Sequence, residues 1–209
     1  MINEKRAVLR AKSDPEAFGE IYDHYYSKIF RFILYRTGRR DVAEDLTAET
    51  FFQALKNLWR FRYTRNPFSS WLYKIAVTQV AMFYRQQKRY CETTFEECPD
   101  LLNATIKEDP TIYLQESIDR NEEYKKMHAS MDALTEDEKN VIALRYFEDL
   151  SVKEVSQVLR MKENTVKSHT RRALAKLREK FEENSGQKKE FEKNHYYGRS
   201  GKIITEPRA

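Results

Sequence analysis

Hydrophobic residues recur at the three-and-four spacing of a helix through the first third of the chain. The Asp14-Pro15 pair is typical of a helix start, where a capping side chain precedes a proline at the first helical position. Thr37-Gly38 is the matching stop signal, so a helix is predicted between the two pairs. The apolar positions of this helix are Phe18, Ile21, Tyr22, Tyr25, Ile29, Phe30 and Ile33.

Two further helices are predicted before residue 90. One runs from about Asp41 to Leu58, and its inward positions are Ala43, Phe51, Ala54, Leu55 and Leu58. Asn66-Pro67 repeats the cap-and-proline pair and begins the next helix. The apolar side of that helix carries Phe68, Trp71, Leu72, Ile75, Ala76 and Phe83.

The connection between these two helices has the sequence WRFRYTR, residues 59–65, in which aromatic and basic side chains alternate. A period of two is typical of a strand, but no partner strand is predicted. The segment is therefore interpreted as a basic, aromatic loop. Such a composition also suits nucleic acid, because rings stack on bases and cations pair with phosphates.

Periodicity disappears between about Tyr90 and Thr111, where Pro99, Pro110 and a strong acidic bias are found. A segment of this length without structure is unusual inside a compact domain, so it is predicted to be a linker. Two interpretations of its charge stay open: a solvated tether, or an acidic mimic of nucleic acid that shields a basic groove.

Beyond the linker the pattern predicts one helix, carrying Leu114, Ile118, Tyr124 and Met131, and then three shorter helices. The sequences TEDE (135–138) and SVKE (151–154) are both capping boxes, with a hydroxyl at the cap and a carboxylate three residues later. The helix from Ser151 ends near Leu159, and the turn RMKEN leads into a last helix that reaches about Lys180. Two helices joined by so short a turn indicate a helix-turn-helix.

The last helix has two distinct faces. Val166, Ala173, Leu174 and Leu177 are predicted to face inward. Lys167, Ser168, Arg171 and Arg172 face outward, where they suit a DNA major groove. The alternative is a packing unit with a solvated basic face. Eight basic residues against two acidic ones between positions 160 and 180 favour DNA.

Composition agrees with a polar, all-α protein. Only five glycines and five prolines occur in 209 residues, too few for the turns of a sandwich or barrel. No apolar run of membrane-spanning length and no signal peptide is found, so a cytoplasmic protein without membrane insertion is predicted. Cys91, Cys98 and four scattered histidines match no metal or redox spacing. Because nucleophile motifs and phosphate loops are also missing, no enzyme, metal site or cofactor is predicted.

Charge is segregated along the chain, although the net charge is only +5. Residues 41–50 hold four acids and no base, residues 56–90 eight bases and no acid, and residues 91–119 eight acids and one base. Such blocks indicate either more than one polyelectrolyte partner, or domains whose charge prevents them from self-associating.

Four stretches resemble, in their order, the bacterial extracytoplasmic-function (ECF) sigma factors of the sigma-70 family. They are AFGEIYDHYYSKIFRFILYRTG, DVAEDLTAETFFQAL, FSSWLYKIAVTQVAMFYRQQKR and LTEDEKNVIALRYFEDLSVKEVSQVLRMKENTVKSHTRRALAKLRE. The resemblance covers about residues 15–90 and 112–180 and implies a transcription initiation factor made of two small helical domains.

The resemblance gives the predicted segments their roles. Residues 1–90 are expected to bind core RNA polymerase and to recognise and open the −10 element, and residues 112–182 to read the −35 element. Residues 91–111 form the acidic linker between them. Residues 183–209 lie outside the resemblance and are predicted to be a basic, disordered tail.

An acidic stripe on the second helix is the expected polymerase contact. Asp41, Asp45 and Glu49 fall at i, i+4 and i+8, with Phe52 beside them. Alone, such a stripe is more often a solvated helix face. The resemblance implies instead that it grips a coiled coil of the polymerase's largest subunit.

DNA contacts are implied in both domains. For the −10 element, where the displaced non-template strand is captured without nucleotide hydrolysis, the residues are Arg60, Arg62, Arg65, Lys74, Thr78, Arg85, Lys88 and Arg89. Of these, the three loop arginines are expected to contact phosphates, whereas Trp59 and Phe61 suit base stacking and internal packing equally well. For the −35 element the residues are Thr165, Lys167, Ser168, Arg171 and Arg172.

Several positions depart from the family pattern. Ala48 replaces a frequent glutamine, and Thr78 and Met82 replace asparagine and aspartate. In the second domain the departures are Arg160, Lys162, and His169 with Thr170, which replace a common arginine-leucine pair. Arg160 occupies a turn position where the family usually has glycine or asparagine, which tolerate a left-handed backbone. An arginine there is expected to cost about 1 kcal/mol of stability. These changes are expected to alter promoter specificity and to leave the fold intact.

Two rival functions are a stand-alone helix-turn-helix regulator that binds a palindrome as a dimer, and a helical adaptor that binds only proteins. Neither needs an acidic docking stripe or a strand-opening surface, so an initiation factor is favoured. The expected partners are core RNA polymerase, double-stranded promoter DNA and single-stranded non-template DNA at the bacterial nucleoid. An anti-sigma protein is a further candidate partner.

Overall fold

The computed structural model describes residues 3–63, 67–93, 130–185, 196–197 and 203–204. Almost all of these residues are helical, which confirms the predicted all-α fold. The chain divides into two compact units, formed mainly by its N-terminal and its C-terminal parts. Most of the predicted linker, and the predicted helix with Leu114, Ile118 and Tyr124, lie outside the described residues.

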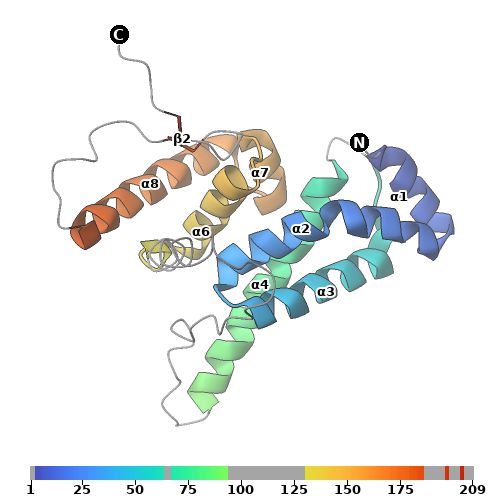
Figure 1. The fold of residues 1–209 in the computed structure, drawn as a ribbon, viewed down its shortest axis with the longest axis horizontal. Helices are drawn as coiled ribbons and strands as arrows, with labels where there is room; N and C mark the ends of the chain where they lie inside the picture. The colour runs from blue at the N-terminus through green and yellow to red at the C-terminus, as the bar shows by residue number, and fades with distance from the viewer. Residues whose placement is uncertain (1–2, 64–66, 94–129, 186–195, 198–202, 205–209) are drawn as a thin grey trace, which may run out of the picture. The chain divides into compact units, whose positions relative to one another are not determined.

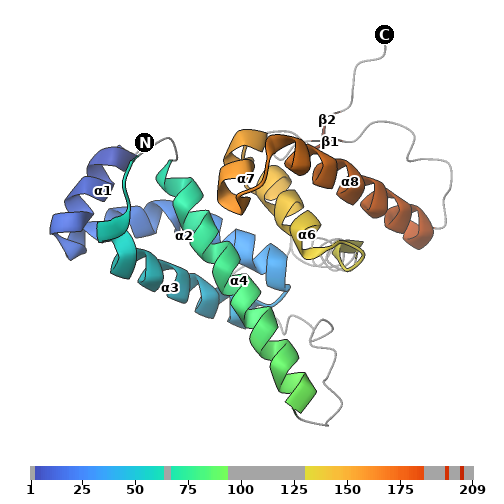
Figure 2. The ribbon, with the colours of Figure 1, turned by 180° about the vertical axis from the view of Figure 1, so that it is seen from behind.

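The first unit is a helical bundle. Its elements are α1 (Glu4–Ser13), the 3-10 turn η1 (Pro15–Ala17), α2 (Phe18–Thr37), α3 (Arg40–Asn57), the 3-10 turn η2 (Leu58–Arg60) and α4 (Phe68–Thr93). Both views show α2 and α3 side by side, with α4 crossing them (Figures 1 and 2). The expected local signals are present, because Asp14 accepts a 3.0 Å hydrogen bond from the N–H of Glu16 and Gly38 ends α2 at φ 67°.

The core of this unit takes one face from each long helix. Its most deeply buried large side chains are Ile21, Ile29, Phe32, Ile33, Phe68, Leu72, Tyr73 and Val80. Two residues predicted to face inward do not, since Tyr22 is 39% and Leu55 38% exposed. Leu55 directly follows the buried Ala54, and a step of 100° along the helix carries it past the narrow buried face of α3. Tyr22 instead lies over Phe51 at the edge of the bundle, with 4.8 Å between ring centroids.

Helix α1 was not predicted from the sequence. Its N-cap is Asn3, whose side chain accepts a 3.1 Å hydrogen bond from the N–H of Arg6. The residues that it buries against α2 are Ala7, Val8 and Ala11. These side chains are small, so the helical spacing of the apolar positions is easily overlooked in a strongly charged segment.

The second unit contains α6 (Glu136–Ile142), the π-helical turn η3 (Ala143–Phe147), α7 (Val152–Leu159) and α8 (Glu163–Ser185). Helix α6 packs against α8, where Met131, Leu134, Ile142 and Ala173 form a buried cluster. Leu174 and Leu177 pack on this cluster as predicted, and Val166 is fully buried. Both capping boxes are confirmed, Thr135 with Glu138 and Ser151 with Glu154.

The tail contains two very short strands that the sequence analysis did not predict. β1 (Tyr196–Tyr197) and β2 (Ile203–Ile204) pair antiparallel, with Tyr196 opposite Ile204. Helix α8 also extends to Ser185, beyond the predicted end near Lys180. None of the helices in the described part of the chain combines the length and apolarity needed to cross a membrane.

Candidate polymerase and nucleic-acid interfaces

The acidic stripe lies on the outer face of α3. Asp41 and Asp45 are exposed and Glu49 is half-buried, so the three carboxylates point away from the core. Asp41 pairs with Arg39, and this hydrogen bond is the main reason why the pKa of Asp41 lies below its usual range. Glu49 accepts a 2.8 Å hydrogen bond from Gln53. Asp45 makes no ion pair with any described residue.

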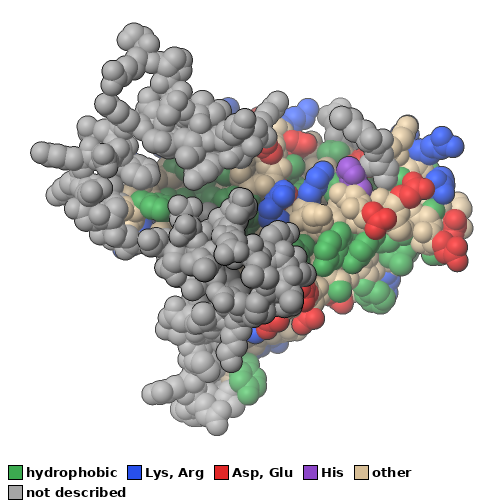
Figure 3. Space-filling view, in the orientation of Figure 1, with side chains coloured by type: hydrophobic (Ala, Val, Ile, Leu, Met, Phe, Trp, Pro, Cys, Tyr) green, Lys and Arg blue, Asp and Glu red, His purple; other side chains and the backbone are tan. Residues whose placement is uncertain are grey.

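Three large apolar side chains follow the stripe through the end of α3 and into η2. Phe52, Leu55 and Trp59 are 57%, 38% and 67% exposed, and they follow one another at i, i+3 and i+7. We call these residues the exposed apolar strip. Figure 3 shows hydrophobic side chains lying next to acidic ones on the face formed by α2 and α3. Sequence reasoning identified only Phe52, although the spacing of the other two was a visible signal.

Residues 59–63, the described part of the WRFRYTR segment, form no strand. The segment begins in η2 and continues as extended backbone at Phe61. Phe61 is only 5% exposed, and its ring centroid lies 5.2 Å from those of both Phe68 and Trp71. Trp59 and Phe61, for which base stacking and internal packing were both possible roles, therefore differ. Phe61 packs in the core, whereas Trp59 faces solvent with the Arg60 guanidinium 4.6 Å above its ring.

Helix α1 holds this loop at two points. Lys12 donates a hydrogen bond to the backbone carbonyl of Phe61, and Glu4 accepts one from the Tyr63 hydroxyl at 3.4 Å. Glu4 also accepts from the Tyr25 hydroxyl. Burial and the nearby Glu4 carboxylate raise the pKa of Tyr25 and Tyr63, which keeps both phenols protonated as donors. Arg60 and Arg62 are exposed on the loop, and Arg65 lies outside the described residues.

The polar face of α4 is exposed as predicted. Thr78, Arg85, Lys88 and Arg89 are exposed, and Lys74 is half-buried. The opposite side of the helix buries Leu72, Ala76 and Val80. The Arg85 Nε donates a hydrogen bond to the carbonyl of Ala81 at 3.2 Å, and the side chain is exposed. Met82 is 42% exposed on this surface.

The turn of the helix-turn-helix has the expected strained geometry. Arg160 adopts φ 54°, in the left-handed region that favours glycine. The following N–H, of Met161, donates to the carbonyl of Ser156 at 3.0 Å, which closes the end of α7. In α8, Thr165, Lys167, Ser168, Arg171 and Arg172 are all exposed. The five predicted −35 residues therefore share an accessible face, while Val166 and Ala173 anchor the helix below them.

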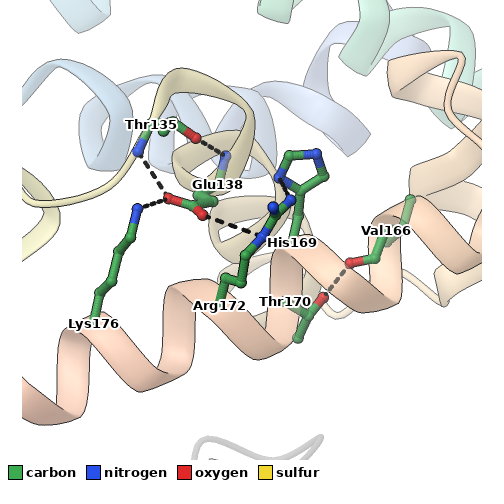
Figure 4. Close-up of polar contacts among 7 residues, drawn as sticks. All are labelled: Thr135, Glu138, Val166, His169, Thr170, Arg172 and Lys176. Atoms are coloured by element: carbon green, nitrogen blue, oxygen red, sulfur yellow. Dashed lines mark hydrogen bonds and ion pairs between the residues drawn. The ribbon is translucent and has the colours of Figure 1, made fainter.

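Arg172 also takes part in a polar cluster that the sequence analysis did not predict (Figure 4). The Glu138 side chain is 3% exposed and forms two ion pairs. Its Oε2 lies 2.7 Å from the Lys176 Nζ, and its Oε1 lies 3.8 Å from the Arg172 Nε. Burial alone would raise the pKa of Glu138, but hydrogen bonds from Lys176 and from the Thr135 N–H lower it below the usual range. The sequence indicated Glu138 only as a capping residue, because its partners on α8 lie far along the chain.

Among the described residues, no group of three or more histidine, cysteine or acidic side chains is arranged to bind a metal ion. The candidate surfaces of the two units therefore offer charge, hydrogen bonds and exposed rings. These are the means by which proteins bind other proteins and nucleic acids.

Solved structures of the same fold are known. CnrH, in complex with the cytosolic domain of CnrY, superposes with a TM-score of 0.65 at 19% identity, covering 87% of this chain and 99% of that one. RpoE from Bartonella quintana, in complex with the anti-sigma factor NepR, gives a TM-score of 0.62 at 18% identity, covering 79% and 96%. At these identities the likeness concerns the fold.

Sequence comparisons identify the family. Residues 21–90 match the family model for Sigma-70 region 2, and residues 130–179 match that for Sigma-70, region 4. The ECF RNA polymerase sigma factor BldN of Streptomyces coelicolor is 33% identical over 175 residues, which cover 81% of this chain but only 62% of BldN. The ECF RNA polymerase sigma factor SigW of Bacillus subtilis is 28% identical over 190 residues, covering 87% of this chain and 97% of SigW. The chain belongs to the sigma-70 family, in its ECF group, whose members direct RNA polymerase to promoters.

Proposed function

We propose that α3 is the surface by which this sigma factor binds core RNA polymerase. One observation carries the proposal: α3 buries one face in the core and still exposes Phe52 and Leu55 on the helix that carries Asp41 and Asp45. Exposed apolar side chains grouped next to exposed charge are typical of a protein interface. The acidic residues suit a basic partner surface, where opposite charge speeds association and fixes the register.

The loop after α3 and the polar face of α4 are assigned to the −10 element. Arg60, Arg62 and Arg85 are exposed cations, and Trp59 is an exposed ring in η2. Cations that follow a nucleic-acid backbone, with rings on which bases stack, are the usual means of binding a single strand. The anchoring of this loop to α1 through Lys12 and Glu4 supports the assignment, because a positioned surface captures an unpaired strand at a lower entropic cost.

The exposed face of α8 is assigned to the −35 element. A second helix that follows a short turn and carries Lys167, Ser168 and Arg172 outward matches the way a helix-turn-helix enters the major groove.

We place the protein at the bacterial nucleoid. An anti-sigma factor is a further proposed partner, since the similar folds of CnrH and RpoE were each solved with a bound partner, an anti-sigma factor in the case of RpoE.

The docking proposal is tested by pairing Asp45→Arg with Phe52→Ala. Both side chains are exposed, so the variant is expected to remain folded by circular dichroism. Its affinity for core polymerase in a pull-down titration should fall by about tenfold or more, because the variant removes a large apolar anchor and also places a positive charge against a basic partner surface. Transcription should fall with it.

A matched control makes the same types of change elsewhere on the first unit. Asp23→Arg with Leu9→Ala reverses one exposed charge on α2 and truncates one exposed apolar side chain on α1. This control should bind polymerase like the parent. Equal capture of the parent and of the folded Asp45→Arg, Phe52→Ala variant would contradict the docking assignment.

A further inference from the structure

The two carboxylate oxygens of Glu138 have separate partners. Oε2 accepts hydrogen bonds from the Thr135 N–H at 3.0 Å and from the Lys176 Nζ at 2.7 Å. Oε1 faces the Arg172 Nε at 3.8 Å and has no other polar partner in the described part of the chain. The Glu138 side chain is only 3% exposed, and a charge so largely shielded from water attracts a nearby cation more strongly than one in bulk water does. Arg172 is therefore drawn to Oε1, although Lys176 already balances the charge of Glu138.

The contacts of Arg172 lie on one edge of its guanidinium. Nε points toward Glu138, and Nη2 lies 3.3 Å from Nδ1 of His169 (Figure 4). In the planar guanidinium, Nε–H and one Nη2–H point to the same side, so the two protein contacts share that edge. The outer edge, formed by Nη1–H and the second Nη2–H, has no partner among the described residues. The side chain remains 57% exposed.

The outer edge has the shape of a base-reading group. Two parallel N–H donors on a guanidinium match the paired O6 and N7 acceptors that guanine presents in the major groove. Other base pairs offer no such pair of acceptors on one base. A guanidinium fixed by its inner edge loses less rotamer freedom on binding than a free arginine side chain does.

We propose that Glu138 and His169 are specificity-determining positioning residues, which hold Arg172 by its inner edge so that its outer edge contacts a guanine of the −35 duplex. The inference rests on the proposed assignment of α8 to that duplex. It also gives a role to His169, which departs from the family pattern. An arginine at position 169 could not accept from Arg172, whereas the imidazole Nδ1 accepts when it carries no proton.

The test measures binding of the full chain with core polymerase to promoters that carry each single base-pair change in the −35 element. Arg172→Ala should reduce discrimination at one guanine-containing base pair by on the order of tenfold. Glu138→Gln keeps an oxygen to accept from Thr135, as capping boxes allow, but removes the charge that faces Arg172. It should reduce discrimination at the same base pair by about threefold or more. Added to Arg172→Ala, it should cause no further loss at that position.

Two variants act as controls. Lys176→Met removes the other cation bound to Glu138 and should leave the discrimination pattern unchanged. His169→Asn keeps an acceptor near the position of Nδ1 and should preserve the preference that His169→Ala weakens. A Glu138→Gln protein that retains full discrimination, or loses affinity equally at every base pair, would overturn the positioning role. If Arg172→Ala itself leaves every preference unchanged, the assignment of Arg172 to the −35 element fails and the inference falls with it.

Discussion

The carboxylate of Glu4 accepts a 3.3 Å hydrogen bond from the backbone N–H of Phe68, the first residue of α4, although the two residues are 64 positions apart. The first N–H groups of a helix have no partner within the helix, so Glu4 acts as a cap supplied by another element. Its negative charge also suits the positive end of the helix dipole. A single side chain of α1 thus joins the start of α4 to the loop that carries Arg60 and Arg62.

Replacing Glu4 should therefore weaken both stability and strand opening. Glu4→Ala removes the cap of α4 and the partner of Tyr63, and the free energy of unfolding should fall by about 1–2 kcal/mol. Thermal unfolding followed by circular dichroism would report a lower Tm. Glu20→Ala is the control, because it breaks only an exposed ion pair with Arg10, which should contribute well under about 1 kcal/mol. An equal loss in both variants would show that Glu4 has no special role.

The residues predicted correctly from the sequence are those whose signal is local. The Asp14 cap, the Gly38 stop and the two capping boxes each involve neighbours within a few positions, so their pattern is visible in the chain itself. The outward face of α8 was also predictable, because Val166 and Ala173 define its inward side at helical spacing.

What could not be predicted depends on contacts between distant segments. In the sequence Glu4 is one charged residue within a strongly charged segment, and only the fold brings the N–H of Phe68 to it. Glu138 likewise satisfies a local capping box, and nothing nearby indicates its pairing with Lys176. The exposure of Leu55 was mispredicted because an apolar residue next to a buried one gives no sign of where the narrow core face of α3 ends.

The strained turn before α8 predicts a stabilising substitution. Arg160 and Asp149 both have positive φ, at 54° and 59°. Arg160→Gly should raise the free energy of unfolding of the second unit by about 1 kcal/mol, because glycine adopts this conformation without steric cost. Asp149→Gly should gain less, since aspartate tolerates the left-handed region better than arginine does. Urea unfolding of both variants compares them, and a larger gain at Asp149 would contradict the strain argument.

Strand opening should depend on the cations of the first unit. The triple change Arg60→Ala, Arg62→Ala and Arg85→Ala removes three exposed charges and no core contact. It should slow open-complex formation and leave −35 binding nearly intact, because α8 is untouched. Permanganate reactivity of unpaired thymines measures the opening. The same three positions changed to lysine keep the charge and should retain most of the parent rate. Unchanged reactivity in the alanine variant would show that these cations are only a solvated surface.

The ion pairs of Glu138 predict how the second unit responds to acid. Because the pKa of Glu138 is lower in the folded chain than its usual 4.5, the folded state favours the charged form. The resulting stabilisation is complete above the unfolded value and is lost as the pH falls through the folded pKa. The glutamine of Glu138→Gln cannot ionise, whereas its partners Lys176 and Arg172 remain partly solvated. The free energy of unfolding of this variant should therefore be about 1–2 kcal/mol lower than that of the parent at pH 7. That difference should persist down to about pH 5 and shrink below about pH 4, as the parent carboxylate takes up its proton. Urea unfolding of parent and variant across this range gives the two curves. A difference that stays constant from neutral pH into acid would mean that Glu138 stabilises α6 by its hydrogen bonds as a cap, and that its charge toward α8 contributes nothing.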